Sequence, residues 1–396
     1  MGGGKALALG VAGVLVALAA GAWLVTREDT AAEPQRTRLT VAEALGGTGG
    51  TEGFARASGP RAFHFPEDHG PHPEFRTEWW YWTGHLETAD GHAFGYQLTL
   101  FRNALAPREA PRDSEWGARE VYMGHFALSD IGAGRFHAFE RFSRAAVGLA
   151  GAQSQPFQVW LEDWKAESSG PGVFPMKLSA ESGGVALSLV LEEGKPPVLQ
   201  GDRGLSQKTA GEGNASYYYS LTRMPTRGTV TVDGRTHEVT GDSWMDREWS
   251  TKSLGAEQVG WDWFAFQLSD GSEFMHYQLR LKDGSADPFS AGVDIPAQGE
   301  SIHLSRDEVR IEVLDSWRSP RSGTPYPARW RLSVPSRQLV LEVTPAQADQ
   351  ELPVTVQYWE GAVRIQGTRA GQPITGRGYV ELTGYGEASA PAPSPR

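Results

Sequence analysis

Acidic and aromatic side chains alternate in the segment GDSWMDREWS, which covers residues 241–250. Alternate side chains of an extended strand point to the same face. One face is therefore expected to carry Asp242, Trp244, Asp246, Glu248 and Ser250. A carboxyl group buried beside aromatic rings keeps its proton to a higher pH than it does in water, as a general acid requires. We predict that Asp246 and Glu248 are catalytic; the alternative is a strand at a domain junction whose charges pair with one another.

A further carboxyl group, that of Glu78, directly precedes the aromatic run WWYW at residues 79–82. If this side chain points inward, it requires a cationic partner such as Arg76, Arg102 or Arg247. The favoured interpretation is a salt bridge that clasps the domains together. The alternative, which we also retain, is a third catalytic carboxylate.

Aromatic and histidine side chains on the expected strands are candidates for binding an apolar substrate. A single histidine on a strand is more often a core residue than a ligand, and consecutive tyrosines more often pack than react. Both kinds are retained as candidates. The predicted substrate-binding residues are Trp80, Trp82, Tyr96, His125, Tyr217, Tyr219, Trp244, Trp261, Trp263 and His276.

Three histidines, His64, His69 and His72, lie close together, and histidine is a common metal ligand. The intervening prolines and glycine predict a loop without regular ligand spacing, so a polar loop at the mouth of a barrel is favoured over a metal site. The chain has no cysteine, no glycine-rich phosphate loop and no HExxH zinc motif. We predict no metal and no other cofactor.

The elements that position these residues are expected to be antiparallel strands. Segments such as GYQLTLF at 95–101 and VALSLVL at 185–191 are strand-like, and Asp-Gly pairs at 233–234 and 283–284 mark tight turns. After residue 60, no window longer than ten residues carries a helical apolar stripe. Many short strands with regular turns predict an all-β sandwich or barrel.

One hairpin pattern occurs twice, 181 residues apart. Trp82 is matched by Trp263, and the tripeptide YQL at 96–98 is matched by YQL at 277–279. Each copy carries an Asp-Gly turn between its two strands. This duplication predicts two related β domains of roughly 150–190 residues each.

The N-terminus is expected to direct or anchor the chain at a membrane. Residues 6–25 are 20 residues without a charge, enough for a helix rising ~1.5 Å per residue to cross the ~30 Å hydrocarbon core. Cleavage among the small residues at 17–22 would make the segment a signal peptide instead. Lys5 favours export of the chain that follows. We predict a location on the periplasmic side of the inner membrane, anchored, or secreted after cleavage.

The charge balance excludes one class of partner. The 396 residues include 37 Lys and Arg against 48 Asp and Glu, for a net charge of −11. Such a chain has no surplus of cations to replace phosphate counterions, so we predict that it does not bind nucleic acid. Its length suits two domains.

Seven segments together resemble the AttH/carotenoid 1,2-hydratase (CrtC-like) family: TEWWYWTGHL, FGYQLTLFR, YMGHFAL, YYYSLTRMPTRG, GDSWMDREWS, WDWFAFQLSDG and YWEGAVRIQG…GRGYVELTGY. The resemblance runs from about residue 61 to residue 386 and implies an all-β fold of two tandem lipocalin-like antiparallel β-barrels. The predicted organisation has five parts: a signal peptide or transmembrane anchor at 1–26, a flexible linker at 27–60, an N-terminal lipocalin-like domain at 61–250, a C-terminal one at 251–388, and a disordered tail at 389–396.

The resemblance also implies a chemistry. Characterised enzymes of the family hydrate a carbon–carbon double bond of an isoprenoid chain, and the Asp thought to protonate the alkene falls on Asp246. The Tyr of the family's Tyr-x-Asp motif is Trp244 here, and the His-Asn that follows it is Arg247-Glu248. Bacterial members are often described as secreted hydrolases and lie near ABC transporter permeases. We therefore expect acid-assisted hydration or hydrolysis of an isoprenoid or lipid; the alternative is a non-catalytic lipid carrier that works with an ABC transporter.

Overall fold

The computed structural model describes residues 50–107, 114, 116–252 and 254–386. The predicted membrane segment at 6–25, most of the predicted linker and the predicted tail lie outside the described residues. None of the helices within these ranges has the length and apolar character needed to span a membrane. By their internal contacts, the described residues belong to one unit, residues 39–396.

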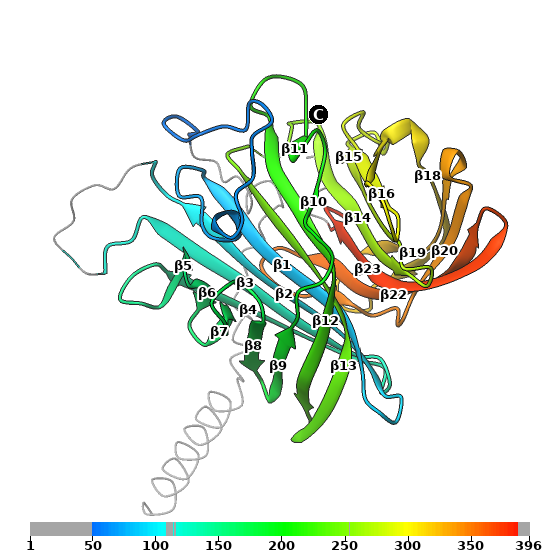
Figure 1. Cartoon of the computed structure of the whole chain (residues 1–396), viewed down its shortest axis with the longest axis horizontal. Coiled ribbons are helices and arrows are strands. Elements are labelled where there is room, and N and C mark those ends of the chain that lie inside the picture. Colours follow the sequence, from blue (N-terminus) through cyan, green and yellow to red (C-terminus); the bar gives the residue numbers. More distant parts are fainter. Residues whose placement is uncertain (1–49, 108–113, 115, 253, 387–396) are drawn as a thin grey trace, which may run out of the picture. The chain divides into compact units, whose positions relative to one another are not determined.

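Thirteen strands form the first sheet, in the order β4-β3-β2-β1-β13-β12-β9-β8-β7-β6-β5, with β10 and β11 also paired to β12. Their bounds are β1 (Thr77–Glu87), β2 (Ala93–Ala104), β3 (Glu120–Asp130), β4 (Arg135–Arg144), β5 (Ala150–Ser154), β6 (Phe157–Leu161), β7 (Trp164–Ser168), β8 (Met176–Ser182), β9 (Val185–Leu191), β10 (Val198–Leu199), β11 (Leu205–Gln207), β12 (Ala215–Val232) and β13 (Arg235–Ser250). Figure 1 shows these strands in blue to green.

Ten strands form the second sheet, in the order β17-β16-β15-β14-β23-β22-β20-β19-β18, with β21 paired to β22. Their bounds are β14 (Gln258–Leu268), β15 (Glu273–Leu281), β16 (Ala291–Ile295), β17 (Ile302–Ser305), β18 (Arg310–Arg318), β19 (Pro325–Val334), β20 (Leu339–Pro345), β21 (Glu351–Leu352), β22 (Tyr358–Arg369) and β23 (Gln372–Thr383). They run from yellow-green to red in Figure 1.

The helices of the described residues are three short 3₁₀ turns: η1 (Glu67–His69), η2 (Arg306–Glu308) and η3 (Pro335–Arg337). The predicted all-β fold with two tandem lipocalin-like sheets is therefore confirmed. The predicted Asp-Gly turn between β12 and β13 follows from backbone chemistry, since Asp233 and Gly234 both have positive φ (51° and 69°). This pair of conformations matches the twist of an antiparallel hairpin.

The two sheets repeat one connectivity. In the first, the hairpin β1–β2 is joined by β13 and then β12; in the second, the hairpin β14–β15 is joined in the same way by β23 and then β22. The residues matched by the 181-residue sequence repeat lie on opposite faces of their strands, however. Trp80 and Trp82 lie in the core of the first sheet, whereas Trp261 and Trp263 face the space between the sheets. If the alignment of the two copies is wrong by one residue, each side chain is matched to one on the opposite face of the other strand.

Each sheet buries both of its faces over the central strands. Even-numbered residues of β1, such as Trp82, enter the core of the first sheet, while Phe264 and Phe266 of β14 enter that of the second. The opposite faces meet in a third apolar cluster that joins residues of both sheets, including Tyr81 and Tyr379. This shared layer positions the acidic residues described below.

The layer leaves no room for an added side-chain atom at Gly95 of β2. A Cβ there would lie 2.6 Å from the hydroxyl oxygen of Tyr379 and 2.8 Å from the Cβ of Ala362, both in the second sheet. We expect Gly95→Ala to lower the free energy of unfolding by about 1–3 kcal/mol, because overpacking moves the sheets apart. Urea denaturation measures this loss. Gly172→Ala is the matched control, since a Cβ at Gly172 meets no atom within 4 Å; equal effects of the two substitutions would contradict the tight packing.

Candidate active site

Asp246 lies on β13 and points into the layer between the two sheets. Its strand alternates as expected, so Trp244 and Glu248 share this face, while Arg247 and Trp249 point into the first sheet. In the pairing of β1 with β13, Asp246 lies opposite Tyr81. Only 4% of the Asp246 surface is exposed.

Three donors hold the Asp246 carboxyl in place. Ser220 Oγ and Trp244 Nε1 donate to its Oδ1 at 2.6 and 2.7 Å, and the Tyr218 hydroxyl donates to Oδ2 at 2.5 Å. The Tyr218 oxygen in turn accepts a hydrogen bond of 3.1 Å from Trp263 Nε1 of the second sheet. Because Oδ1 already has two donors, an acid proton is best carried on Oδ2.

Burial raises the pKa of Asp246 from 3.8 to about 7. The hydrogen bonds from Ser220, Tyr218 and Trp244 oppose this rise, and the nearby charge of Glu248 adds to it. Arg247 pairs with Glu78 on the other face of the strand and is not among the main causes of this pKa shift. Asp246 therefore carries a proton that it can release close to neutral pH.

Glu248 shares the pocket with Asp246 but has a cationic partner. Lys208 Nζ lies 3.0 Å from its Oε1 and 4.2 Å from the centre of the Tyr277 ring. Ser216 Oγ also donates to Oε1. The pKa of buried Lys208 is raised overall. Burial is the largest single effect and lowers this pKa, but the charge of Glu248, the charge of Tyr277 and the hydrogen bond to Glu248 together outweigh it. The Glu248–Lys208 ion pair therefore fits the role of a fixed, charged part of the cavity wall better than that of a second acid.

A cavity of about 100 Å³ opens in front of these carboxyl groups, between the two sheets. This volume is several times what a single water molecule needs. Its walls are mainly aromatic and come from both sheets, with Trp79 and Tyr81 on one side and Trp261 and Trp263 on the other. The cavity can admit a small apolar group together with water.

Two more carboxyl groups lie on the second sheet, and one of them lines the cavity. Glu381 of β23 lines the cavity and accepts a 2.5 Å hydrogen bond from Trp261 Nε1. Glu360 of β22 lies directly opposite Glu381 in the strand pairing and accepts a 2.8 Å hydrogen bond from the Tyr81 hydroxyl. Burial raises the pKa of Glu381 to about 7, and that of Glu360 well above its ordinary value.

His125, a predicted substrate-binding residue, also lines the cavity. Its Nδ1 lies 2.8 Å from the hydroxyl of Tyr358, and its Nε2 lies 3.2 Å from Glu140 Oε1. Tyr358 and Tyr218 occupy comparable strands, β22 and β12, so a tyrosine stands on each side of the cavity.

Several predicted binding residues lie on the opposite face, inside the core of the first sheet: Trp80, Trp82, Tyr96, Tyr217 and Tyr219. The reason is the strand alternation itself, because the neighbouring residues Trp79, Tyr81 and Tyr218 face the cavity. Tyr96 bonds to Ser243 Oγ at 2.6 Å within this core. These five side chains are therefore not brought together with Asp246.

His276 is also separated from the cavity. On β15 it lies opposite Phe264, on the face that forms the core of the second sheet. Its Nδ1 has no hydrogen-bond partner among the described residues, and burial lowers its pKa to about 3. A neutral core histidine fits these observations.

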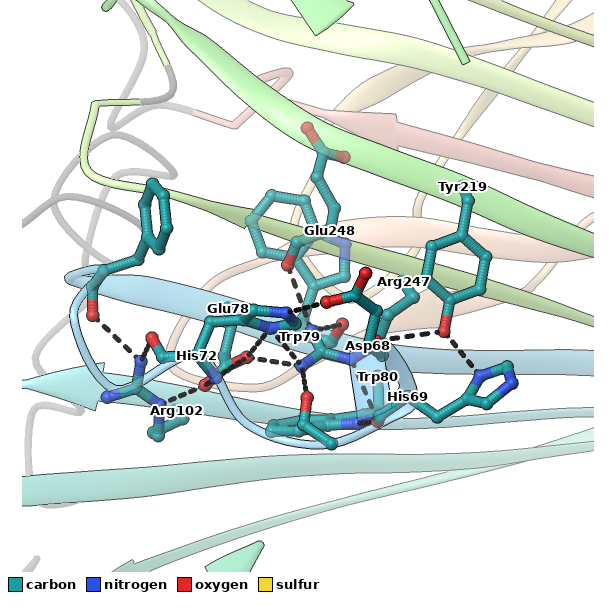
Figure 2. Close-up of polar contacts among 12 residues, drawn as sticks. Asp68, His69, His72, Glu78, Trp79, Trp80, Arg102, Tyr219, Arg247 and Glu248 are labelled. Carbon is teal, nitrogen blue, oxygen red and sulfur yellow. Dashed lines mark hydrogen bonds and ion pairs between the residues drawn. The ribbon is translucent and has the colours of Figure 1, made fainter. Parts of the chain in front are cut away.

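Glu78 points away from Asp246, into a cationic network inside the first sheet (Figure 2). Arg102 and Arg247 each donate to one of its oxygens, and the backbone N–H of His72 donates to both at 3.1 Å. Burial alone would raise the pKa of Glu78, but these partners hold it well below its ordinary value. The favoured salt bridge is present, with Arg102 and Arg247 as partners, but it joins β1, β2 and β13 within the first sheet rather than clasping two domains. The alternative, in which Glu78 acts with Asp246, does not fit an ionised carboxylate on the other face.

The same network ties the preceding segment to the first sheet. His72 stacks on Trp249, with ring centres 3.7 Å apart, and its Nε2 lies 3.1 Å from Asp68 Oδ1. Arg61 donates to both oxygens of Asp68. Within the described ranges, no group of three or more His, Cys, Asp or Glu side chains is arranged to hold a metal ion.

Sequence reasoning missed several residues of the site. Tyr81 and Tyr218 stand inside aromatic runs. Because every position of these runs is apolar, the pattern does not show which alternate residues face the cavity. Glu360 and Glu381 stand in segments that carry the family resemblance, where a charged residue inside an apolar strand could have marked them. Lys208 lies in a loop and has no local pattern that points to it.

Comparisons with known proteins found a family model and solved structures that match most of the chain. A family model described as AttH-like matches residues 56–385. The crystal structure of an AttH homologue from Nitrosomonas europaea is 37% identical, with a TM-score of 0.74, and the match covers 84% of this chain and 100% of that one. A comparison with curated proteins gave no match.

Two more distant structures share the fold. Kievitone hydratase from Nectria haematococca has a TM-score of 0.65 at 14% identity, covering 83% of this chain and 97% of its own. A structure of CghA has a TM-score of 0.51 at 14% identity, covering 85% and 97%. At such identities the likeness shows the fold alone.

We expect Asp246→Asn to stabilise the protein, and more so at alkaline pH. The folded-state pKa of Asp246 is about 7, above the ordinary 3.8, so the folded state holds an extra proton between these values. The free energy of unfolding therefore falls as the pH rises from about 4 to about 7. The advantage of the Asn variant is expected to grow by about 2–3 kcal/mol between about pH 5 and about pH 8, measured by urea denaturation.

Glu78→Gln is the control with the opposite sign. Its folded-state pKa is lowered, so its ion pairs stabilise the protein at neutral pH, and their loss is expected to cost about 3–5 kcal/mol. A destabilising Asp246→Asn change at about pH 8 would contradict a buried, proton-holding carboxyl.

Proposed function

The chain belongs to the AttH-like family, and from this premise we propose that it hydrates a carbon–carbon double bond of an apolar, isoprenoid-like substrate with Asp246 as the acid. One observation carries the proposal: the Asp246 carboxyl, with a pKa of about 7, faces an aromatic cavity between the two sheets. The hydratase among the structural neighbours is consistent with it.

The chemistry follows from the geometry. The proton on Asp246 Oδ2 is transferred to one alkene carbon, and the neighbouring carbon becomes a cation. Trp79, Trp261 and Trp263 line the cavity, and the electron-rich face of an aromatic ring stabilises such a cation. A water oxygen then forms the new C–O bond, and the loss of one of its protons completes the alcohol. Exclusion of bulk water strengthens each of these electrostatic interactions.

A carrier of isoprenoids or lipids that works with an ABC transporter is the second candidate, and the apolar cavity favours it equally. The two functions differ at Asp246. Binding by a carrier is independent of its proton, whereas hydration requires that proton.

Hydration is tested with three probe alkenes, geranylgeraniol, squalene and lycopene, in ¹⁸O-labelled water. We expect mass spectrometry to find a product that has gained one labelled water, and Asp246→Asn to lower the rate by about 10²–10⁴-fold. Asp242→Asn is the matched control, because Asp242 lies on the same strand outside the cavity and is expected to keep the activity. Unaltered probe binding to wild type and Asp246→Asn, without product from either, would favour the carrier.

The pH dependence follows from the pKa of Asp246. Only the protonated form is an acid, so the hydration rate is expected to fall above about pH 7 and to approach a tenfold loss per pH unit. Probe binding, followed by quenching of tryptophan fluorescence, is expected to stay constant over the same range. A hydration rate that increases between about pH 7 and about pH 9 would exclude Asp246 as the acid.

A further inference from the structure

We infer that Glu360 and Glu381 form a second proton-transfer centre in the cavity, which takes the proton released by the water that adds to the substrate. The inference rests on the proposed function, because it assigns the step that follows protonation by Asp246. It concerns residues of the second sheet, whereas the acid belongs to the first.

The two carboxyl groups are held side by side by the strand pairing. Glu360 on β22 is the direct partner of Glu381 on β23; Glu360 is fully buried, and Glu381 is half-buried at the cavity wall. Trp261 Nε1 donates to Glu381, and the Tyr81 hydroxyl donates to Glu360 Oε1. The second oxygen of Glu360, Oε2, is fully buried and meets no donor among the described residues.

No cation of the described residues pairs with these two carboxyl groups; Lys208, which lines the same cavity, is paired with Glu248. Glu78 has two arginines and Glu248 has Lys208, whereas no ion pair is made by Glu360 or Glu381 in the part of the chain that the structure describes. Two directly adjacent carboxyl groups, one of them fully buried, cannot both be ionised without a cation. The pair is therefore assigned one shared proton, and Glu360 Oε2, the oxygen that meets no donor, is the site available to it. Such a pair can accept a second proton and release it again.

The position of the pair relates it to Asp246. Asp246 lies opposite Tyr81 where β13 pairs with β1, and Glu381 lies opposite Trp263 where β23 pairs with β14. These are comparable strands of the two sheets, and both carboxyl groups line the same cavity. A substrate in the cavity therefore has an acid on one side and a proton acceptor on the other.

The atoms balance over one turnover. The O–H bond of Asp246 breaks as a C–H bond forms, and the attacking water forms a C–O bond as one of its O–H bonds breaks. The proton from the water goes to the pair, which then holds two protons, while Asp246 is left ionised. Return of one proton from the pair to Asp246 restores both groups, and the net reaction is alkene plus water to alcohol.

The shared proton is tested without any substrate. At about pH 9 exposed carboxyl groups are ionised, so an infrared carbonyl band of a protonated carboxyl group reports buried acids. We expect wild type and Asp246→Asn to keep this band and Glu360→Gln to lose it, because the Gln amide can donate to an ionised Glu381. Absence of the band from wild type, or its persistence in folded Glu360→Gln, would overturn the shared proton. Circular dichroism checks the fold of each variant.

The catalytic role is tested by separating protonation from water addition. In deuterated water, reversible protonation places deuterium in the unreacted probe alkene, while hydration yields the alcohol. We expect Glu381→Gln to lower hydration by about 100-fold and to keep deuterium exchange, whereas Asp246→Asn loses both. Glu381→Asp is expected to restore part of the hydration. Wild-type hydration in Glu381→Gln, or equal loss of both reactions, would overturn the assignment.

The same experiment separates the two proposals. If wild type exchanges and hydrates no probe, the proposed function and the catalytic role of the pair fail together, and the infrared band alone decides whether a shared proton exists. If wild type hydrates the probes but Glu381→Gln behaves like wild type, the proposed function stands and this inference is overturned.

Discussion

Two β-sheets that each bury one face in a core of their own are pressed together through their other faces, and the carboxyl groups of the cavity lie in that second layer. Burial is the largest contribution to the raised pKa of Asp246 and of Glu381. The acidity of the site is therefore a property of the packing between sheets rather than of either sheet. Close approach at Gly95, where a single added carbon would collide with Tyr379, is part of the same constraint.

The strand alternation sorts charges of opposite character onto opposite faces. Glu78 points into the first sheet, where Arg102 and Arg247 keep it ionised, and it serves stability. Asp246 points the other way, where only neutral donors reach it. Arg247 lies one residue from Asp246 in sequence, yet it forms no ion pair with the Asp246 carboxyl group because its side chain is on the other face of the strand. A strand with two buried faces can thus hold a permanent ion and a proton donor side by side.

The sequence predicts those parts of this arrangement that depend on local pattern. Period-two alternation correctly groups Trp244, Asp246 and Glu248, and Asp-Gly pairs locate hairpins such as the one at Asp233. Local pattern fails where every residue is apolar, as at Tyr217–Tyr219, because either phase satisfies it. It also fails for Glu360 and Glu381, since their partners Tyr81 and Trp261 are fixed by contacts between distant segments.

The hydrogen bonds between the sheets cross over: Tyr81 of the first sheet bonds to Glu360 of the second, and Trp263 of the second bonds to Tyr218 of the first. Each sheet thus supplies a hydrogen-bond donor that supports an acid group of the other. The bonded residues are 279 positions apart in one crossed bond and 45 apart in the other, so a change at either end alters chemistry encoded in the segment of the other sheet. The site therefore depends on the segments that form both sheets. Recombination that exchanges one of these segments between distant relatives would separate the hydrogen-bond donors from the carboxyl groups they hold.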